Sequence, residues 1–242
     1  MQKVSASEIV TPDATSGKGP SVVKLVASPN PTPEERTAVM KVNSGGKTID
    51  VNIVQEAGEQ VVVIPEFDFL VLRYSWESTD GSDFDTATGF TNTGIMDVDG
   101  KFVGWSKNWT TTQTQIGEYL IHGGDNMQSG KEAALINMKK LLAAEGLNEN
   151  EPNIEAVIYG NWYGAKGAGN VVVSFTAYLG GEMIKEGFNF VNEGGEEVYS
   201  DSITTNVSAT GENNYQNITG LYTKIGTVVY NKEKRDCVII IS

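Results

Sequence analysis

The amino-acid sequence predicts a mainly all-β fold, in which a partial immunoglobulin-like sandwich precedes a larger β-sandwich with one short helix. Short apolar runs rich in Val, Ile, Phe and Tyr recur along the chain, separated by Gly, Asn and Pro, which is typical of sandwiches and barrels. The 242 residues suffice for one large core or two small ones. We place the domain boundary at "EAGEQ" (56–60), which gives domains at 1–58 and 59–242.

The first domain begins with residues 1–20, which are rich in Ser, Thr, Pro and Gly and predict an irregular lead-in. "SVVKLVAS" (21–28) predicts a strand. "RTAVMKVNSGGKTIDVNIVQE" (36–56) alternates polar and apolar residues on both sides of a Ser-Gly-Gly turn. Such alternation about a Gly-Gly turn predicts a β-hairpin.

The second domain contains further apolar runs, separated by Gly and Asn turns, that we interpret as strands. These runs are "VVVIP", "FDFLVLRYSW", "KFVGW", "EAVIYGNWYG", "NVVVSFTAYLGG", "KEGFNFVNEGG", "NITGLYTKIGTVVYNK" and "CVIII".

The segment "SGKEAALINMKKLLAAEG" (129–146) fits two interpretations. As a helix it would begin at a Ser129 cap, with Glu132 completing a capping box and Gly146 ending it. As a strand it would point alternate apolar residues inward until a short helix begins at about residue 139. Periodicity alone does not decide between the two.

Composition narrows the class of partner. With 31 Asp and Glu against 18 Lys and Arg, the net charge is −13, which argues against binding nucleic acid or anionic membrane surfaces. No apolar run reaches the about 18 residues of a transmembrane helix. The start, "MQKVSASEIV", lacks a basic end followed by an apolar stretch, so we expect a cytoplasmic chain or a mature form whose leader is removed. The single cysteine, Cys237, excludes an internal disulfide and is interpreted as a buried strand residue.

Two acidic loops suggest a shared cation. "STDGSDFDT" (78–86) carries Asp83 and Asp85, which can face one ion if the chain bends there. "YLIHGGDNMQSGKE" (119–132) adds Asp125 and Asn126, with Glu132 as a possible bidentate ligand. Calcium takes about six to eight oxygen ligands of these kinds. If the loops lie apart, the same residues are only surface turns.

Other chemistry is less well supported by the residues. His122, the sole histidine, is interpreted as a packed or hydrogen-bonded strand-end residue rather than a ligand, because calcium prefers oxygen. A glycosidase-type carboxylate pair could be drawn from Asp85, Asp125 or Glu132, but these acids serve better as ligands, and we expect no catalytic residues. Trp105 and Trp109 flank "SKN" and form a possible platform for a sugar or peptide, whereas Trp76 is expected in the core.

Residues 20–57 resemble the BACON domain, the Bacteroidetes-associated carbohydrate-binding, often N-terminal module. The matching text is "NPTPEERTAVMKVNSGGKTIDVNIVQEA", with its Asn-Pro-Thr turn, Gly-Gly hairpin and closing Val-x-Gln. The earlier strands of that module, with their usual tryptophan, are missing, so this part resembles the back half of an immunoglobulin-like sandwich. The resemblance implies an extracytoplasmic location, at the cell surface or in the periplasm.

Residues from about 65 to 242 are similar to the tellurium-resistance TerD family. The similarity rests on "YSWESTDGSDFDTATGF", in which Asp83-Phe84-Asp85 stands in the Asp-Leu-Asp place, and on "YLIHGGDNMQSGKEAALINMKKL". It implies a calcium-binding β-sandwich and favours the strand interpretation of 132–138. One departure is that Glu132 stands alone where the family often has consecutive acids.

Together these observations predict a non-enzymatic extracytoplasmic or cell-surface protein, with a calcium-stabilised sandwich that binds a glycan or a surface protein. The alternatives are a carbohydrate-binding accessory protein without metal and a carboxylate-based glycoside hydrolase.

Overall fold

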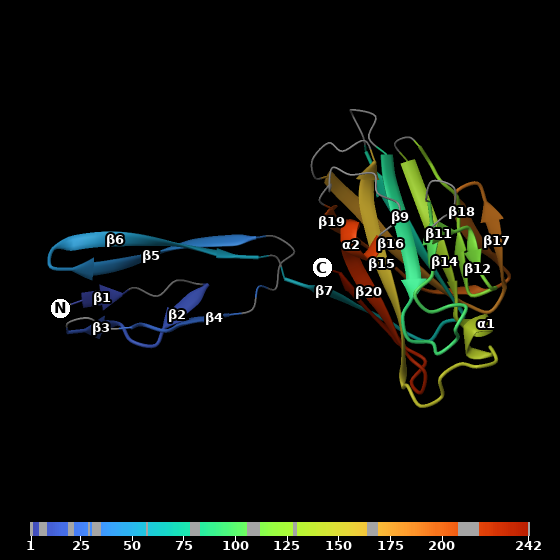
Figure 1. Ribbon diagram of the computed structural model, residues 1–242, viewed down its shortest axis with the longest axis horizontal. Coiled ribbons are helices and arrows are strands. Elements are labelled where there is room, and N and C mark those ends of the chain that lie inside the picture. The colour runs from blue at the N-terminus through green and yellow to red at the C-terminus, as the bar shows by residue number, and fades with distance from the viewer. Residues whose placement is uncertain are drawn as a thin grey trace. The chain divides into compact units, whose positions relative to one another are not determined.

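The computed structural model describes the chain except for residues 1, 5–8, 19–21, 29, 31–34, 57, 78–82, 106–111, 128–129, 164–168, 208–217 and 242. The described residues are mostly strand with two short helices, which confirms the predicted all-β class. They divide into two compact units, residues 1–60 and residues 61–241 (Figure 1).

The first unit contains two small sheets. One has the order β3-β1-β5-β6 and the other pairs β2 with β4. The strands are β1 (Gln2–Val4), β2 (Val10–Pro12), β3 (Ser16–Gly17), β4 (Leu25–Ala27), β5 (Arg36–Ser44) and β6 (Lys47–Gln55). The expectation of an irregular lead-in over residues 1–20 is therefore wrong for three short stretches. They become strands because β1 pairs with β5 and β2 with β4, which composition cannot reveal.

The predicted hairpin is confirmed. β5 and β6 pair from Arg36 opposite Gln55 to Ser44 opposite Lys47. Gly45 and Gly46 form the turn with φ of 60° and 78°. A two-residue turn with both φ values positive matches the twist of the strands it joins, and glycine adopts it without steric cost.

The second unit is a sandwich of two large sheets and a covering hairpin (Figure 1). The seven-stranded sheet has the order β11 (Thr112–Gln113), β10 (Phe102–Gly104), β9 (Asp83–Phe90), β15 (Asn153–Tyr163), β20 (Thr223–Asn231), β21 (Cys237–Ile241), β7 (Gln60–Ile64). The six-stranded sheet has the order β12 (Gln115–Ile116), β13 (Leu120–His122), β14 (Gly130–Asn137), β8 (Phe69–Trp76), β16 (Gly169–Leu179), β19 (Glu196–Val207). The hairpin consists of β17 (Glu182–Glu186) and β18 (Asn189–Glu193).

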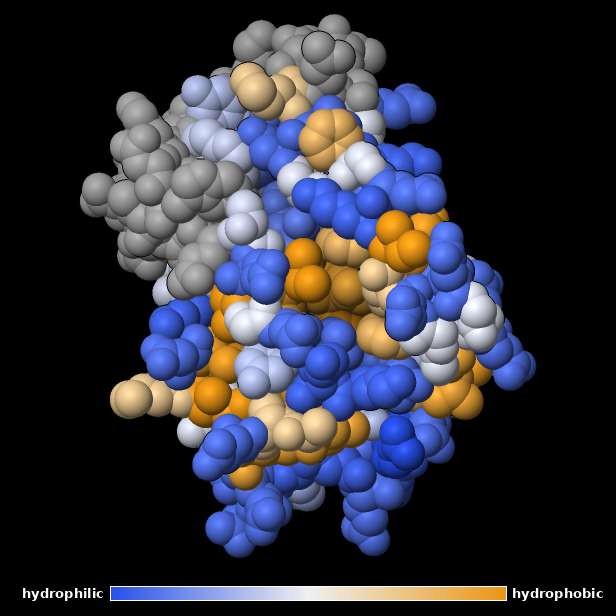
Figure 2. Space-filling view, turned by 90° about the vertical axis from the view of Figure 1, so that its right-hand side faces the viewer, coloured by the Kyte–Doolittle hydropathy of each residue, from blue (hydrophilic) through white to orange (hydrophobic). Residues whose placement is uncertain are grey.

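Strand β8 shows how the core is divided. Leu72 and Tyr74 point into the main core between the two sheets, as does Trp76, which confirms the expectation for that tryptophan. Val71 points the other way and packs with Phe190 of β18 in a second cluster. Burying each such side chain contributes about 1.5–3 kcal/mol. On the side of this unit seen in Figure 2, apolar residues reach the surface in patches that hydrophilic residues separate.

The ambiguous segment is a strand followed by a short helix. β14 pairs with β8 along its whole length, with Glu132 opposite Tyr74, so the interpretation of Glu132 as part of a helix cap is wrong. Ser129 lies outside the described residues. The helix is α1 (Met138–Leu142), and it is Asn137 whose side chain caps it by accepting from the Lys140 amide at 3.1 Å. Pairing with β8 and β13 supplies the hydrogen bonds that helix formation would otherwise provide.

The second helix, α2 (Ile218–Leu221), is a single turn. Neither described helix has the length and apolar character needed to span a bilayer. Cys237 is fully buried in β21, as predicted, and burial raises the pKa of its thiol to about 12.

Candidate metal centre

Two acidic residues stand at the start of β9. Asp83 and Asp85 are separated by one residue, so both side chains lie on the same face of the strand. Only 8% of Asp83 and 1% of Asp85 is exposed. A buried carboxylate is unfavourable in its charged form unless a positive charge or hydrogen bonds offset the loss of water.

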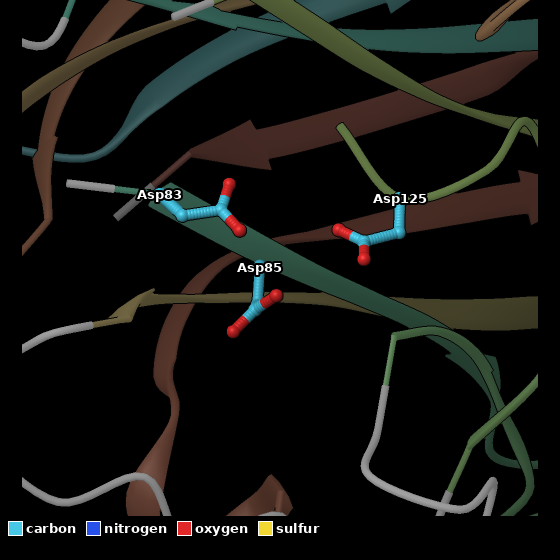
Figure 3. Close-up of side chains that lie close together, drawn as sticks. All are labelled: Asp83, Asp85 and Asp125. Carbon is cyan, nitrogen blue, oxygen red and sulfur yellow. The ribbon is translucent and has the colours of Figure 1, made fainter. Parts of the chain in front are cut away.

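A third acidic residue comes from the loop between β13 and β14. The Gly123 amide donates to the Ala133 carbonyl oxygen at 2.7 Å, so the loop closes against β14. A Cβ on Gly123 would lie 2.5 Å from the Phe188 carbonyl oxygen, and Gly124 has a φ of 121° that favours glycine. These two glycines fix a path that brings Asp125 toward β9 (Figure 3).

The three carboxylates converge. One oxygen each from Asp83, Asp85 and Asp125 lies within 4.8 Å of the others, and we call these three residues the acidic cluster. Figure 3 shows Asp83 and Asp125 pointing toward each other, with Asp85 beside them. Asp83 Oδ1 accepts from the Phe84 amide at 2.8 Å, but Asp85 Oδ2 and Asp125 Oδ1 are buried without a hydrogen-bond partner. Within the described part of the chain, no ion pair involves the acidic cluster.

The buried carboxylates of the acidic cluster repel one another when they are charged. Burial, together with the charges of Asp125 and Glu132, raises the pKa of Asp83 to about 7. Burial also holds the pKa of Asp85 well above its usual range, with Glu132 and Asp83 adding to the effect. The pKa of Asp125 is raised by burial and by Glu132. Either protons or a bound cation must therefore neutralise these groups.

Glu132 lies beside the acidic cluster rather than within it. It is fully buried, and its Oε2 accepts from Thr86 Oγ1 at 2.7 Å and lies 3.3 Å from His122 Nε2. Its Oε1 accepts from the Asn126 amide at 3.3 Å. Glu132 therefore ties together β9, β13 and the loop that carries Asp125.

The other residues predicted for the site have separate positions. The Asn126 side chain donates to the Lys131 carbonyl oxygen at 3.3 Å. His122 is 2% exposed beside Glu132, which confirms its interpretation as a buried, hydrogen-bonded strand-end residue. Thr86 has no signal in the sequence, because its contact with Glu132 joins strands of different sheets.

Of the two tryptophans predicted to form a ligand platform, the structure describes only one. Trp105 is half-buried and meets Tyr163 edge to face, with ring centroids 6.3 Å apart. Trp109 lies outside the described residues. Trp162 is a core residue, 6% exposed, whose indole nitrogen donates to the Val207 carbonyl oxygen at 3.1 Å.

The donor set decides what the centre can hold. Its available atoms are carboxylate oxygens, and the only cysteine is in β21. Oxygen-only sites suit hard cations such as calcium. A hydrolytic carboxylate pair would have to touch a sugar, whereas Glu132 and Asp85 are 0% and 1% exposed.

Comparison with known proteins gives a partial match. Residues 5–56 match the BACON family, described as "Putative binding domain, N-terminal". The match supports the resemblance of the first unit and begins earlier than the expected residue 20. No curated protein and no solved structure matches the chain. The resemblance of the second unit to the TerD family has no support in these comparisons.

Proposed function

We propose that this chain is a non-enzymatic binding module whose larger sandwich is stabilised by a calcium ion held between β9 and the β13–β14 loop. The observation that carries the proposal is the convergence of three carboxylates within 4.8 Å, two of them with a buried oxygen that has no partner. Two unit charges about 4 Å apart interact by about 4 kcal/mol at an effective dielectric of 20. A divalent cation turns this repulsion into attraction.

The residues present fit calcium. Asp83, Asp85 and Asp125 would hold the ion, and Asn126 directly follows Asp125 in the chain. Glu132 contributes its charge and holds the loop in place through the Asn126 amide. Calcium tolerates irregular geometry and a mixture of carboxylates, carbonyls and water, which suits a site assembled from a strand and a loop.

The ion has a structural role in this proposal. It joins a loop of the six-stranded sheet to a strand of the seven-stranded sheet, and so closes one end of the sandwich. A sandwich end made rigid in this way is a suitable surface for binding a glycan or a surface protein.

We place the module outside the cytoplasm, at the cell surface or in the periplasm. Extracellular calcium modules have dissociation constants of about 10⁻⁴–10⁻³ M, and we expect this site to bind calcium in that range. The match of the first unit to a family described as "Putative binding domain, N-terminal" supports the binding role alone. A dissociation constant far below this range would argue for a different compartment.

The competing explanation is a binding module without metal, in which protons neutralise the acidic cluster. Calcium titration followed by thermal unfolding separates the two. Calcium should raise the melting temperature of the wild type and of Asp97→Asn, which removes an exposed acid paired with Lys101. Calcium should leave the melting temperature of Asp85→Asn unchanged. The absence of any shift in the wild type, or an equal shift in both variants, would refute the calcium site.

A further inference from the structure

Two aromatic side chains span the strand that carries Asp83 and Asp85. Tyr163 of β15 stands directly opposite Asp83 in the antiparallel pair, so the two side chains share one face of the sheet. Trp105 directly follows β10, which pairs with β9 on its other side. Because the rings of Trp105 and Tyr163 meet, their contact crosses β9 next to the acidic cluster.

The exposure of Tyr163 differs from that of its neighbours. Asn161 and Trp162 are 1% and 6% exposed, whereas Tyr163 is 42% exposed. The interplanar angle of 67° with Trp105 is an edge-to-face contact, which holds the tyrosine ring in one orientation. A ring held in this way offers contact area to a ligand at little entropic cost.

The cation would have coordination positions to spare. Calcium takes about six to eight oxygens, and three carboxylates supply only part of that number. One of their oxygens, Asp83 Oδ1, already accepts a hydrogen bond from the Phe84 amide. Asp125 is only half-buried, so the ion would be open to solvent on that side. Water or the oxygens of a ligand would fill the remaining positions.

The negative charge of the site determines which class of ligand it can bind. The acidic cluster and Glu132 together carry four carboxylates, so one divalent ion leaves the site negative. The chain as a whole carries a net charge of −13. A phosphate or carboxylate ligand would be repelled, whereas neutral hydroxyl oxygens would not.

We propose that the cation and Tyr163 together bind a neutral saccharide. Two adjacent hydroxyl oxygens of the sugar coordinate the ion in place of water, and the apolar C–H face of the sugar ring stacks on Tyr163. Trp105 keeps the tyrosine ring in position. This inference rests on the proposed calcium site and adds the ligand class to it.

The test uses the full chain on a printed array of neutral glycans, in calcium and in chelator. Each glycan is also printed after periodate oxidation, which cleaves the carbon–carbon bond between adjacent hydroxyl-bearing carbons and converts both hydroxyls to carbonyl groups. The wild type should bind at least one glycan in calcium, with loss of binding in chelator and on the oxidised spot. Binding that persists in chelator or on the oxidised spot would overturn the coordination.

Variants separate the two proposals. Tyr163→Ala should weaken glycan binding by about tenfold and keep the calcium-induced rise in melting temperature. Tyr163→Phe should bind like the wild type, because the ring is kept. Met96→Ala, which removes a side chain that is 88% exposed, is the control and should also bind like the wild type. If calcium raises the melting temperature but no glycan binds, the saccharide inference fails and the calcium site stands; if calcium has no effect on melting, the site itself fails.

Discussion

The hydroxyl of Thr86 donates to the carboxylate of Glu132 at 2.7 Å, and this bond joins β9 of one sheet to β14 of the other. Both residues are almost fully buried, at 1% and 0% exposure. A hydrogen bond to a charged, buried acceptor is stronger than one between neutral groups. Glu132 therefore acts as a brace between the sheets, and its negative charge also raises the pKa values of all three members of the acidic cluster.

Replacing Glu132 should lower the stability of the protein more than it weakens calcium binding. We expect Glu132→Gln to lower the free energy of unfolding of the metal-free protein by about 1–3 kcal/mol, because Thr86 and the Asn126 amide lose a charged acceptor. Urea unfolding in chelator measures this change. Calcium should still stabilise the variant, since the three clustered carboxylates remain.

A matched comparison decides whether Glu132 is itself a ligand. Asp85→Asn makes the same chemical change within the acidic cluster and should abolish the calcium effect. If Glu132→Gln also abolished it while leaving metal-free stability intact, Glu132 would have to coordinate the ion directly.

The raised pKa of Asp83 predicts an unusual dependence of stability on pH. Its folded-state pKa of about 7 lies above the usual value of about 3.9, so the folded chain binds this proton more tightly than the unfolded chain. In chelator, this carboxyl therefore destabilises the protein progressively as the pH rises from about 4 to about 7. Calcium should reverse the trend, because the ion requires the deprotonated carboxylates.

Unfolding of the wild type and of Asp83→Asn at about pH 5 and about pH 8, in chelator, measures the effect. Relative to the wild type, Asp83→Asn should be more stable at the higher pH than at the lower one. A difference that does not change with pH would show that Asp83 has an ordinary pKa in the folded state.

The acidic residues of the site are easier to predict from the sequence than the residues that support them. Asp83, Asp85 and Asp125 are visible because carboxylates concentrate in two segments of the sequence, and the fold brings the start of β9 close to the loop between β13 and β14. The positions of Thr86 and Tyr163 depend on which strands become neighbours, and a single sequence does not specify that pairing. The three short strands within residues 1–20 escape prediction for the same reason, since β1 and β2 pair with strands later in the chain.

The loop that carries Asp125 depends on glycine. A Cβ on Gly123 would meet the Phe188 carbonyl oxygen at 2.5 Å, so Gly123→Ala should displace the loop and weaken calcium binding. Gly180→Ala is the control, because Gly180 has open space around its Cβ position and its substitution strains only the left-handed backbone there, with a φ of 68°. Both variants should lose stability, and only Gly123→Ala should require more calcium for half-saturation in a titration. Equal calcium requirements would mean that the loop path is not set by this contact.

Arg73 of β8 forms hydrogen bonds with the hairpin β17–β18 and so connects this hairpin to the six-stranded sheet. Its guanidinium donates to Asn189 Oδ1 at 2.6 Å, to Thr176 Oγ1 at 2.7 Å and to the Phe190 carbonyl oxygen at 3.1 Å. Arg73→Lys keeps the charge but cannot reproduce three divergent bonds from one planar group. The hairpin amides should therefore exchange hydrogen faster in the variant, while those of β15 stay protected.

Because the Phe188 carbonyl between β17 and β18 approaches Gly123, calcium binding should weaken as the hairpin loosens, though less than in Gly123→Ala. Unchanged exchange in the hairpin would show that its apolar contacts with Phe69, Val71 and Leu135 hold it without Arg73.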